Sequence, residues 1–66
     1  MVIQEIGEAA GKVWHCLNEK GEMTITRLKK ELKMADPLLN RALGWLAREN
    51  KLRFEQTKTG VKVRLA

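Results

Sequence analysis

The sequence predicts one mainly helical α+β domain over residues 1–66, with three helices followed by a C-terminal β-hairpin. Three stretches before residue 50 repeat apolar residues at gaps of three and four, the spacing of helices buried on one face. After residue 51, two runs alternate apolar and polar residues around a turn that contains glycine, as a hairpin does. A chain of 66 residues has room for one domain with a small core.

The first helix is expected to end near Asn18, with Gly21 in the turn that follows. Its inward face is formed by Ile3, Ile6, Ala10, Val13 and Leu17. The next three residues, Met23-Thr24-Ile25, are too few to stand alone as a strand, so we expect them at the edge of a small sheet.

The second helix is expected to begin at Thr26, whose hydroxyl can cap the following turns. Leu28 and Leu32 lie four residues apart and therefore share the inward face. Arg27, Lys30 and Lys33 lie on the opposite side of the helix. This helix is therefore expected to present a basic outer face.

The third helix is expected to begin at Asp36-Pro37, because Asp can cap a helix and Pro in the first turn loses no useful donor. Leu39, Ala42, Leu43 and Leu46 form its core face, and Arg41, Gly44 and Arg48 lie opposite. Asn50 is suited to end the helix in a left-handed conformation.

The hairpin register follows from the facing of its side chains. A four-residue loop, Thr57-Lys58-Thr59-Gly60, sets apolar residues opposite one another: Phe54 opposite Val63 and Leu52 opposite Leu65, with Glu55 opposite Lys62. A three-residue loop would set Phe54 opposite Arg64 and mix the core face with the solvent face. We therefore expect the four-residue register.

Only Met34, Ala35 and Asp36 separate the second and third helices, so this pair reads as a helix-turn-helix with the hairpin as its wing. Residues 6–14, 23–32 and 42–49, the last reading ALGWLARE, resemble a family of short prokaryotic winged helix-turn-helix proteins that is largely uncharacterised. The resemblance implies the fold and a presumed role in DNA binding. Residues 39–43 with Leu46 are also similar to recognition helices of bacterial winged-helix regulators, in which an Arg at the place of Arg41 often touches phosphate or base edges.

Charge is divided unevenly along the chain. Residues 1–26 carry two Lys against four Glu, whereas residues 27–66 carry eleven Lys or Arg against four acidic residues. A basic C-terminal part favours a polyanionic partner. Double-stranded DNA is such a partner, because Lys and Arg displace the counterions condensed on its phosphates.

The candidate DNA contacts follow from this arrangement. The N-terminal half of the third helix is expected in the major groove, with Asn40 and Arg41 at base edges and Arg48 further along. The expected phosphate contacts are Arg27, Lys30 and Lys33 of the second helix and Lys58 and Lys62 of the wing.

An alternative reading makes the third helix a protein surface. Leu38 and Trp45 lie on one side of it and could form an apolar strip that binds a partner protein or a second copy. Gly44 would then permit close approach of the partner's backbone. A homodimer is also expected because the core is small and the first helix is apolar.

Other classes of function find no support in the sequence. His15 and Cys16 are neighbours that point apart on a helix, so no metal site is expected, and no nucleophile has a base at a useful spacing. We expect neither an enzyme nor a cofactor nor a small-molecule ligand. The N-terminus lacks a signal peptide, no apolar run could cross a bilayer, and a single unpaired Cys suits the cytoplasm.

Overall fold

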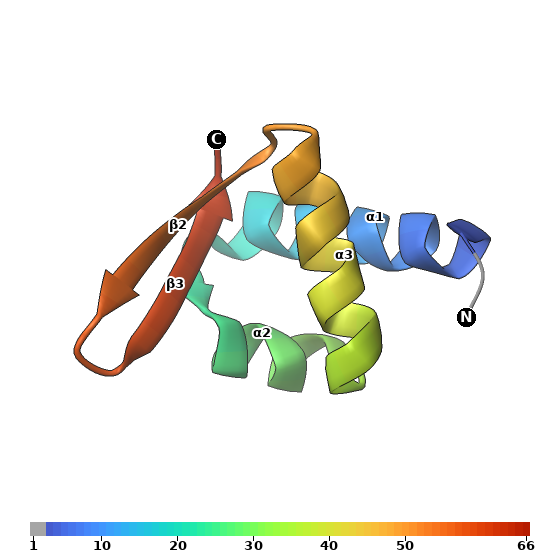
Figure 1. Ribbon diagram of the computed structural model, residues 1–66. Helices are drawn as coiled ribbons and strands as arrows, with labels where there is room; N and C mark the ends of the chain where they lie inside the picture. The colour runs from blue at the N-terminus through green and yellow to red at the C-terminus, as the bar shows by residue number, and fades with distance from the viewer. Residues whose placement is uncertain (1–2) are drawn as a thin grey trace.

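The computed structural model describes residues 3–66. The chain runs through α1 (Ile3–Lys20), β1 (Met23–Thr24), α2 (Ile25–Leu32), α3 (Asp36–Arg48), β2 (Leu52–Thr57) and β3 (Gly60–Leu65). The strands form one antiparallel sheet in the order β1-β3-β2. The fold expected from the sequence, with three helices, a hairpin and a short edge strand before α2, is therefore confirmed (Figure 1).

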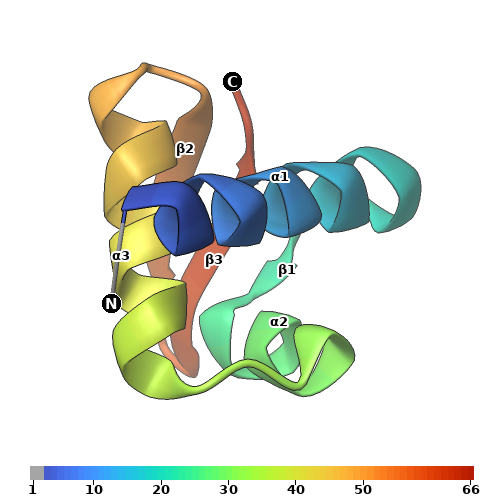
Figure 2. The ribbon, with the colours of Figure 1, turned by 90° about the vertical axis from the view of Figure 1, so that its right-hand side faces the viewer.

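The core lies where the three helices meet the central strand. Its four largest fully buried side chains come from four different elements: Val13 of α1, Leu28 of α2, Leu39 of α3 and Val63 of β3. The helix α1 packs across α3 and forms the outermost layer when the molecule is seen from that side (Figure 2). The wing, formed by β2 and β3, projects on the opposite side of α3 (Figure 1).

The ends of the helices differ in detail from the expected ones. Helix α1 continues two residues beyond Asn18, to Lys20, before Gly21 turns the chain at a φ of 82°. The cap of α2 is Thr24 rather than Thr26: its Oγ1 accepts a hydrogen bond from the Arg27 amide at 3.2 Å. Thr24 is the last residue of β1, so its backbone is already extended, as a cap requires.

The start of α3 is also shifted. Ala35 occupies the cap position without a side-chain hydrogen bond, and Asp36 lies within the first turn next to Pro37. There the carboxylate faces the positive end of the helix dipole, and its Oδ1 lies 2.8 Å from Nζ of Lys29. Asn50 follows the end of α3 at a φ of 59°, the left-handed conformation expected for it.

The register of the hairpin is the expected one. Leu52 lies opposite Leu65, Phe54 opposite Val63, and Glu55 opposite Lys62. The strands pair one step further than expected, to Thr57 opposite Gly60, so the turn itself is Lys58 and Thr59 alone.

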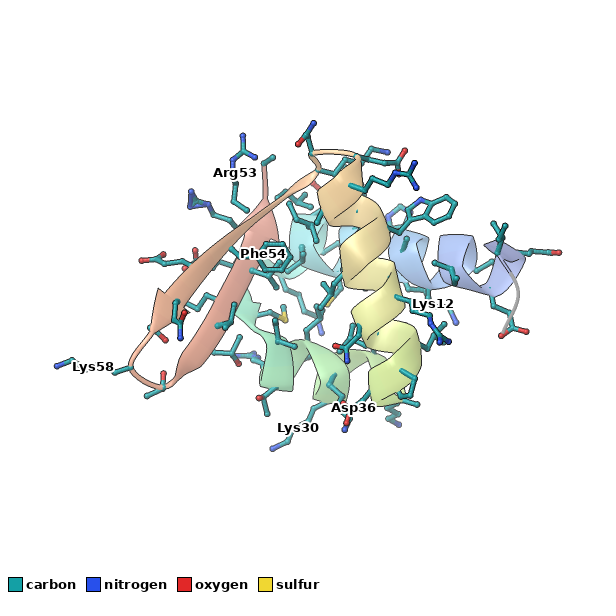
Figure 3. The ribbon with its side chains drawn as sticks, viewed as in Figure 1. Lys12, Lys30, Asp36, Arg53, Phe54 and Lys58 are labelled. Carbon is teal, nitrogen blue, oxygen red and sulfur yellow. The ribbon has the colours of Figure 1, made fainter. Side chains whose placement is uncertain are left out.

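Phe54 is the exception on the inward face of the hairpin. Its partner Val63 is fully buried, yet Phe54 itself is 47% exposed. The reason is the strand order: β3 is covered from both sides, whereas β2 is an edge strand. The ring lies between the wing and α3, where no further strand covers it (Figure 3).

An ion pair joins the C-terminal ends of α1 and α2. Lys20 Nζ donates to Glu31 Oε2, and Nε of Arg27 lies 3.6 Å from the other carboxylate oxygen. The hydrogen bond and charge of Lys20 lower the pKa of Glu31 below its ordinary 4.5, and Glu31 raises the pKa of Lys20 above 10.5. The pair therefore stabilises the fold between these two pKa values.

The capping of α2 can be tested with two neighbouring threonines. We expect Thr24→Ala to lower the free energy of unfolding by about 1 kcal/mol, because it removes a side-chain cap. For a domain of this size that is a fall in Tm of about 4–8 °C. Thr26→Ala is the matched control and is expected to leave Tm nearly unchanged in the same thermal melts. Equal losses for the two variants would contradict the assignment.

The ion pair can be tested through the pH dependence of Tm. A lowered pKa means that the stabilisation by Glu31 is present above its ordinary pKa and is lost as pH falls through the folded value. We expect Glu31→Gln to flatten the decline of Tm as pH falls below 4.5, the ordinary pKa of this carboxyl group. Glu19→Gln, which removes a nearby charge that is in no ion pair within residues 3–66, is expected to keep the decline.

Candidate nucleic-acid interface

The outer face of α2 carries three exposed cations. Arg27 is engaged by Glu31 of the same helix, as described above. Lys30 and Lys33 take part in none of the ion pairs formed within residues 3–66. Lys33 is the left-handed residue that ends the helix, and its amide is bonded to the carbonyl of Lys29. The C-terminal half of α2 therefore offers two ammonium groups that the chain itself leaves available.

The outer side of α3 is a ridge formed by Arg41, Gly44 and Arg48, which follow one another at helical spacing. Leu39, Ala42, Leu43 and Leu46 are buried on the opposite side, which fixes the ridge outward. A Cβ placed on Gly44 would meet no atom within 4 Å. The ridge is therefore low at its centre and flanked by guanidinium groups. Asn40 is exposed on the flank next to Arg41.

The wing carries one cation at its tip and one along its length. Lys58 is exposed in the two-residue turn and takes part in no ion pair among the described residues. Lys62 is partly buried, and its Nζ lies 3.9 Å from a carboxylate oxygen of Glu22. Figure 3 shows Lys58 at the free end of the wing and Lys30 beneath α2, near the start of α3 at Asp36. In this view Lys30 and Lys58 both lie on the wing side of α3, at the base of α2 and at the tip of the hairpin.

Two further cations were missed in the sequence. Arg53 and Arg64 lie directly opposite each other across β2 and β3, and both are exposed. Like charges in this position destabilise a strand pair by up to about 1 kcal/mol, and a bound anion would relieve the repulsion. The predicted hairpin register could have identified them, because it places every second residue of the two strands, including these two arginines, on the outward face.

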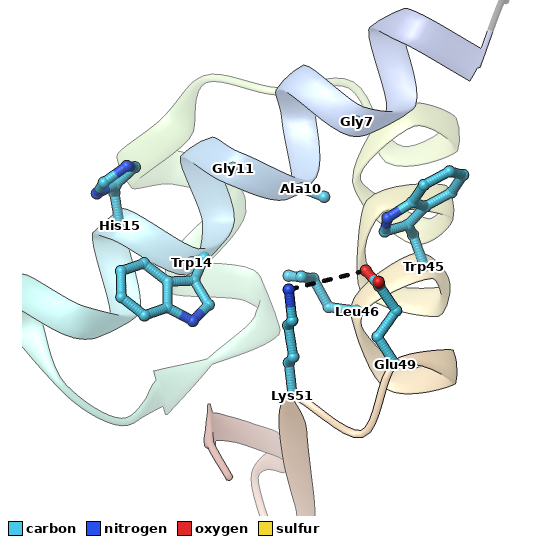
Figure 4. A pocket seen from close by; sticks show the side chains of 9 residues that line it. All are labelled: Gly7, Ala10, Gly11, Trp14, His15, Trp45, Leu46, Glu49 and Lys51. Carbon is cyan, nitrogen blue, oxygen red and sulfur yellow. Dashed lines mark ion pairs between the residues drawn. The ribbon is translucent and has the colours of Figure 1, made fainter.

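The two apolar candidates of α3 have different surroundings. Leu38 is half-buried and packs against the core. Trp45 is 39% exposed and lines a groove whose other wall is α1, at Gly7, Ala10, Gly11 and Trp14 (Figure 4). Glu49 and Lys51 form an ion pair of 4.0 Å that lies between the two indoles (Figure 4).

Two other kinds of site were sought in the part of the chain that the structure describes. Residues 3–66 contain no group of three His, Cys, Asp or Glu side chains that could hold a metal ion. Among the described helices, none is both long and apolar enough to span a membrane.

Similar proteins have this architecture. Protein BT2368 from Bacteroides thetaiotaomicron, solved by NMR, superposes with a TM-score of 0.85 at 35% identity over 98% of this chain and 79% of that one. An uncharacterised protein of Methanocaldococcus jannaschii, MJ1608, is 41% identical over 51 residues, which cover 73% of this chain and 71% of the relative.

Two more distant structures show the fold alone. The transcriptional regulator PA4135 has a TM-score of 0.80 at 24% identity, covering 89% of this chain and 46% of the regulator. The Zalpha domain of PKZ from Carassius auratus, solved in complex with Z-DNA, has a TM-score of 0.80 at 20% identity, covering 92% of this chain and 97% of that domain.

The sequence itself matches a family model over residues 1–65, and that family is described as a winged helix-turn-helix domain (DUF2582). The resemblance identified from the sequence is thereby confirmed. With the elements, their order and the wing all in place, the chain belongs to the DUF2582 family of winged helix-turn-helix domains.

Proposed function

We propose that this protein binds double-stranded DNA, with α3 in the major groove and with α2 and the wing on the phosphates. The observation that carries the proposal is the set of cations Lys30, Lys33 and Lys58, which lie on α2, at its end and at the tip of the wing and form no ion pair within residues 3–66. Phosphates on the two edges of a groove are the complementary charges. Winged-helix neighbours include a transcriptional regulator and a domain solved with Z-DNA, which supports the proposal.

The dimensions of α3 suit a groove. Its 13 residues extend about 20 Å, and the major groove of B-DNA is about 12 Å wide. The N-terminal half would bring Asn40 and Arg41 to base edges, where Asn can bond adenine and Arg can bond guanine through two hydrogen bonds each. Arg48, two turns further along the ridge, would contact the backbone. The low centre of the ridge at Gly44 lets the base pairs approach the helix.

The predicted phosphate contacts are not equivalent in this structure. Arg27 and Lys62 already face Glu31 and Glu22, so a phosphate must compete with a carboxylate for each of them. Among residues 3–66, Lys30 and Lys33 face no such competitor. We therefore assign most of the electrostatic contribution of α2 to Lys30 and Lys33.

We also propose that the protein acts in the cytoplasm as a regulator of transcription and not as an enzyme. Occupying a DNA site is the activity that this arrangement of side chains supports. The DNA sequence recognised would be set by Asn40 and Arg41.

A salt titration tests the proposal on α2. The affinity for a random duplex should fall steeply with salt, because each phosphate contact contributes about 0.9 to the slope of log K against log salt. We expect Lys30→Ala with Lys33→Ala to reduce that slope by about 2. Arg27→Ala, on the same helix but paired with Glu31, is the matched control and should reduce it by clearly less. Absence of binding at low salt would refute the proposal.

The role of Asn40 is tested by selection on randomised duplexes. We expect Asn40→Ala to relax the preference at one base pair by about 1–3 kcal/mol while leaving the salt slope unchanged. A uniform loss of affinity for all duplexes, with the preference intact, would show that Asn40 contacts the backbone.

A further inference from the structure

The groove between α1 and α3 is a surface that the proposed DNA interface does not use, and it combines apolar side chains with the Glu49–Lys51 ion pair. It encloses about 250 Å³ and presents the indole rings of Trp14 and Trp45 (Figure 4). Ile3, which is 71% exposed, lies one turn before Gly7 on the same side of α1. Two of the three large hydrophobic side chains that are exposed in residues 3–66 therefore border this one surface.

Two glycines of α1 expose the helix backbone along one wall of the groove. Gly7 and Gly11 lie in the middle of an 18-residue helix, where glycine is less favourable than alanine. A Cβ at either position would meet no atom within 4 Å, so packing inside the chain does not require glycine there. What the two glycines do permit is close approach of another helix from outside.

The distribution of charge on the chain favours one kind of partner for this groove. The chain carries a net charge of +5 and most of its surface is basic, so two copies repel each other on most faces. Helix α1 is the exception: it carries Glu5, Glu8 and Glu19 against Lys12 and Lys20. Within residues 3–66 neither Glu8 nor Lys12 forms an ion pair, although Glu8 accepts a hydrogen bond from Gln4 at 3.5 Å.

We propose that the occupant is a second copy of this chain, with two α1 helices packed antiparallel across Gly7 and Gly11. A two-fold axis between these residues brings Glu8 of one copy toward Lys12 of the other, and the symmetry makes this pair twice. Trp45 of each copy then packs against α1 of its partner. The proposal replaces the Leu38–Trp45 strip of the sequence analysis with a surface formed by α1 and Trp45, since Leu38 packs into the core.

The surface of α1 and the adjoining edge of α3 is large enough for a dimer interface. A specific dimer buries at least about 1,200 Å² in total, or about 600 Å² from each copy. The described surface of one copy is 4722 Å², so α1 and the adjoining edge of α3 need to supply about an eighth of it. The free end of the wing and the outer face of α2 stay uncovered, because the N-terminal half of α1, which holds Gly7 and Gly11, lies across α3 from the wing (Figure 1).

The test is sedimentation equilibrium from about 10 μM to about 1 mM protein, with tryptophan fluorescence on the same samples. We expect the wild type to dimerise in this range with a blue shift of its emission. Glu8→Lys and Lys12→Glu should each weaken dimerisation at least tenfold. The double variant, which restores the pair with the charges exchanged, should recover most of that loss.

A second variant excludes unfolding as the explanation. Gly11→Leu adds a side chain to open space on a helix and should keep or raise Tm, yet it should abolish the dimer. Lys30→Glu, which changes charge on α2, is the control expected to leave dimerisation intact. A wild type that stays monomeric at the highest concentration, or a dimer insensitive to Gly11→Leu, would overturn the proposal.

The outcome is independent of the proposed DNA binding. Gly11→Leu leaves all the proposed DNA contacts in place, so a monomeric variant should still bind a single half-site. A monomeric wild type that binds DNA refutes the dimer alone, whereas a dimer that binds no DNA refutes the proposed function alone.

Discussion

The structure depends on one buried core to which four elements each contribute a fully buried side chain. Val13, Leu28, Leu39 and Val63 are each at most 1% exposed, and each comes from a different helix or strand. A chain this short buries only about 60% of its unfolded surface, so few contacts decide where its elements lie. This core fixes α2 and α3 relative to the central strand β3, and it therefore also sets the spacing of the cations that the proposed function requires. The same packing leaves the outer side of α1 without any element of the chain against it, among the described residues.

The helices and the hairpin register could be predicted because both follow from periodicity, and periodicity reports which side of an element is buried. The cap of α2 could not be predicted. Thr24 and Thr26 are chemically identical, and the choice between them is made by the pairing of β1 with β3, which holds Thr24 extended. The exposure of Phe54 could not be predicted for a similar reason: alternation gives its face and its partner Val63 correctly, but only the strand order shows that an edge strand leaves that face uncovered.

The sequence predicts which residues of the candidate site are exposed cations. It predicts less well which acidic side chains those cations pair with in the folded chain. Exposed cations on α2 and the wing follow from the apolar pattern, which fixes the outward face. The ion pair between Lys62 and Glu22 does not, because the two residues meet only after β3 pairs with β1. The groove lined by Trp14 and Trp45 could not be predicted from the sequence either, because its two walls lie on helices that are far apart along the chain.

The two proposals use different faces of the molecule: DNA binds the basic side formed by α2, α3 and the wing, and a second copy binds the nearly neutral side of α1. The most direct test is to follow the backbone amide resonances by NMR while a short random duplex is added at low salt. The account predicts shifts concentrated around Lys30, Asn40 and Lys58, with little change at Gly7 and Gly11. Shifts confined to the α1 groove, or none at all, would contradict it.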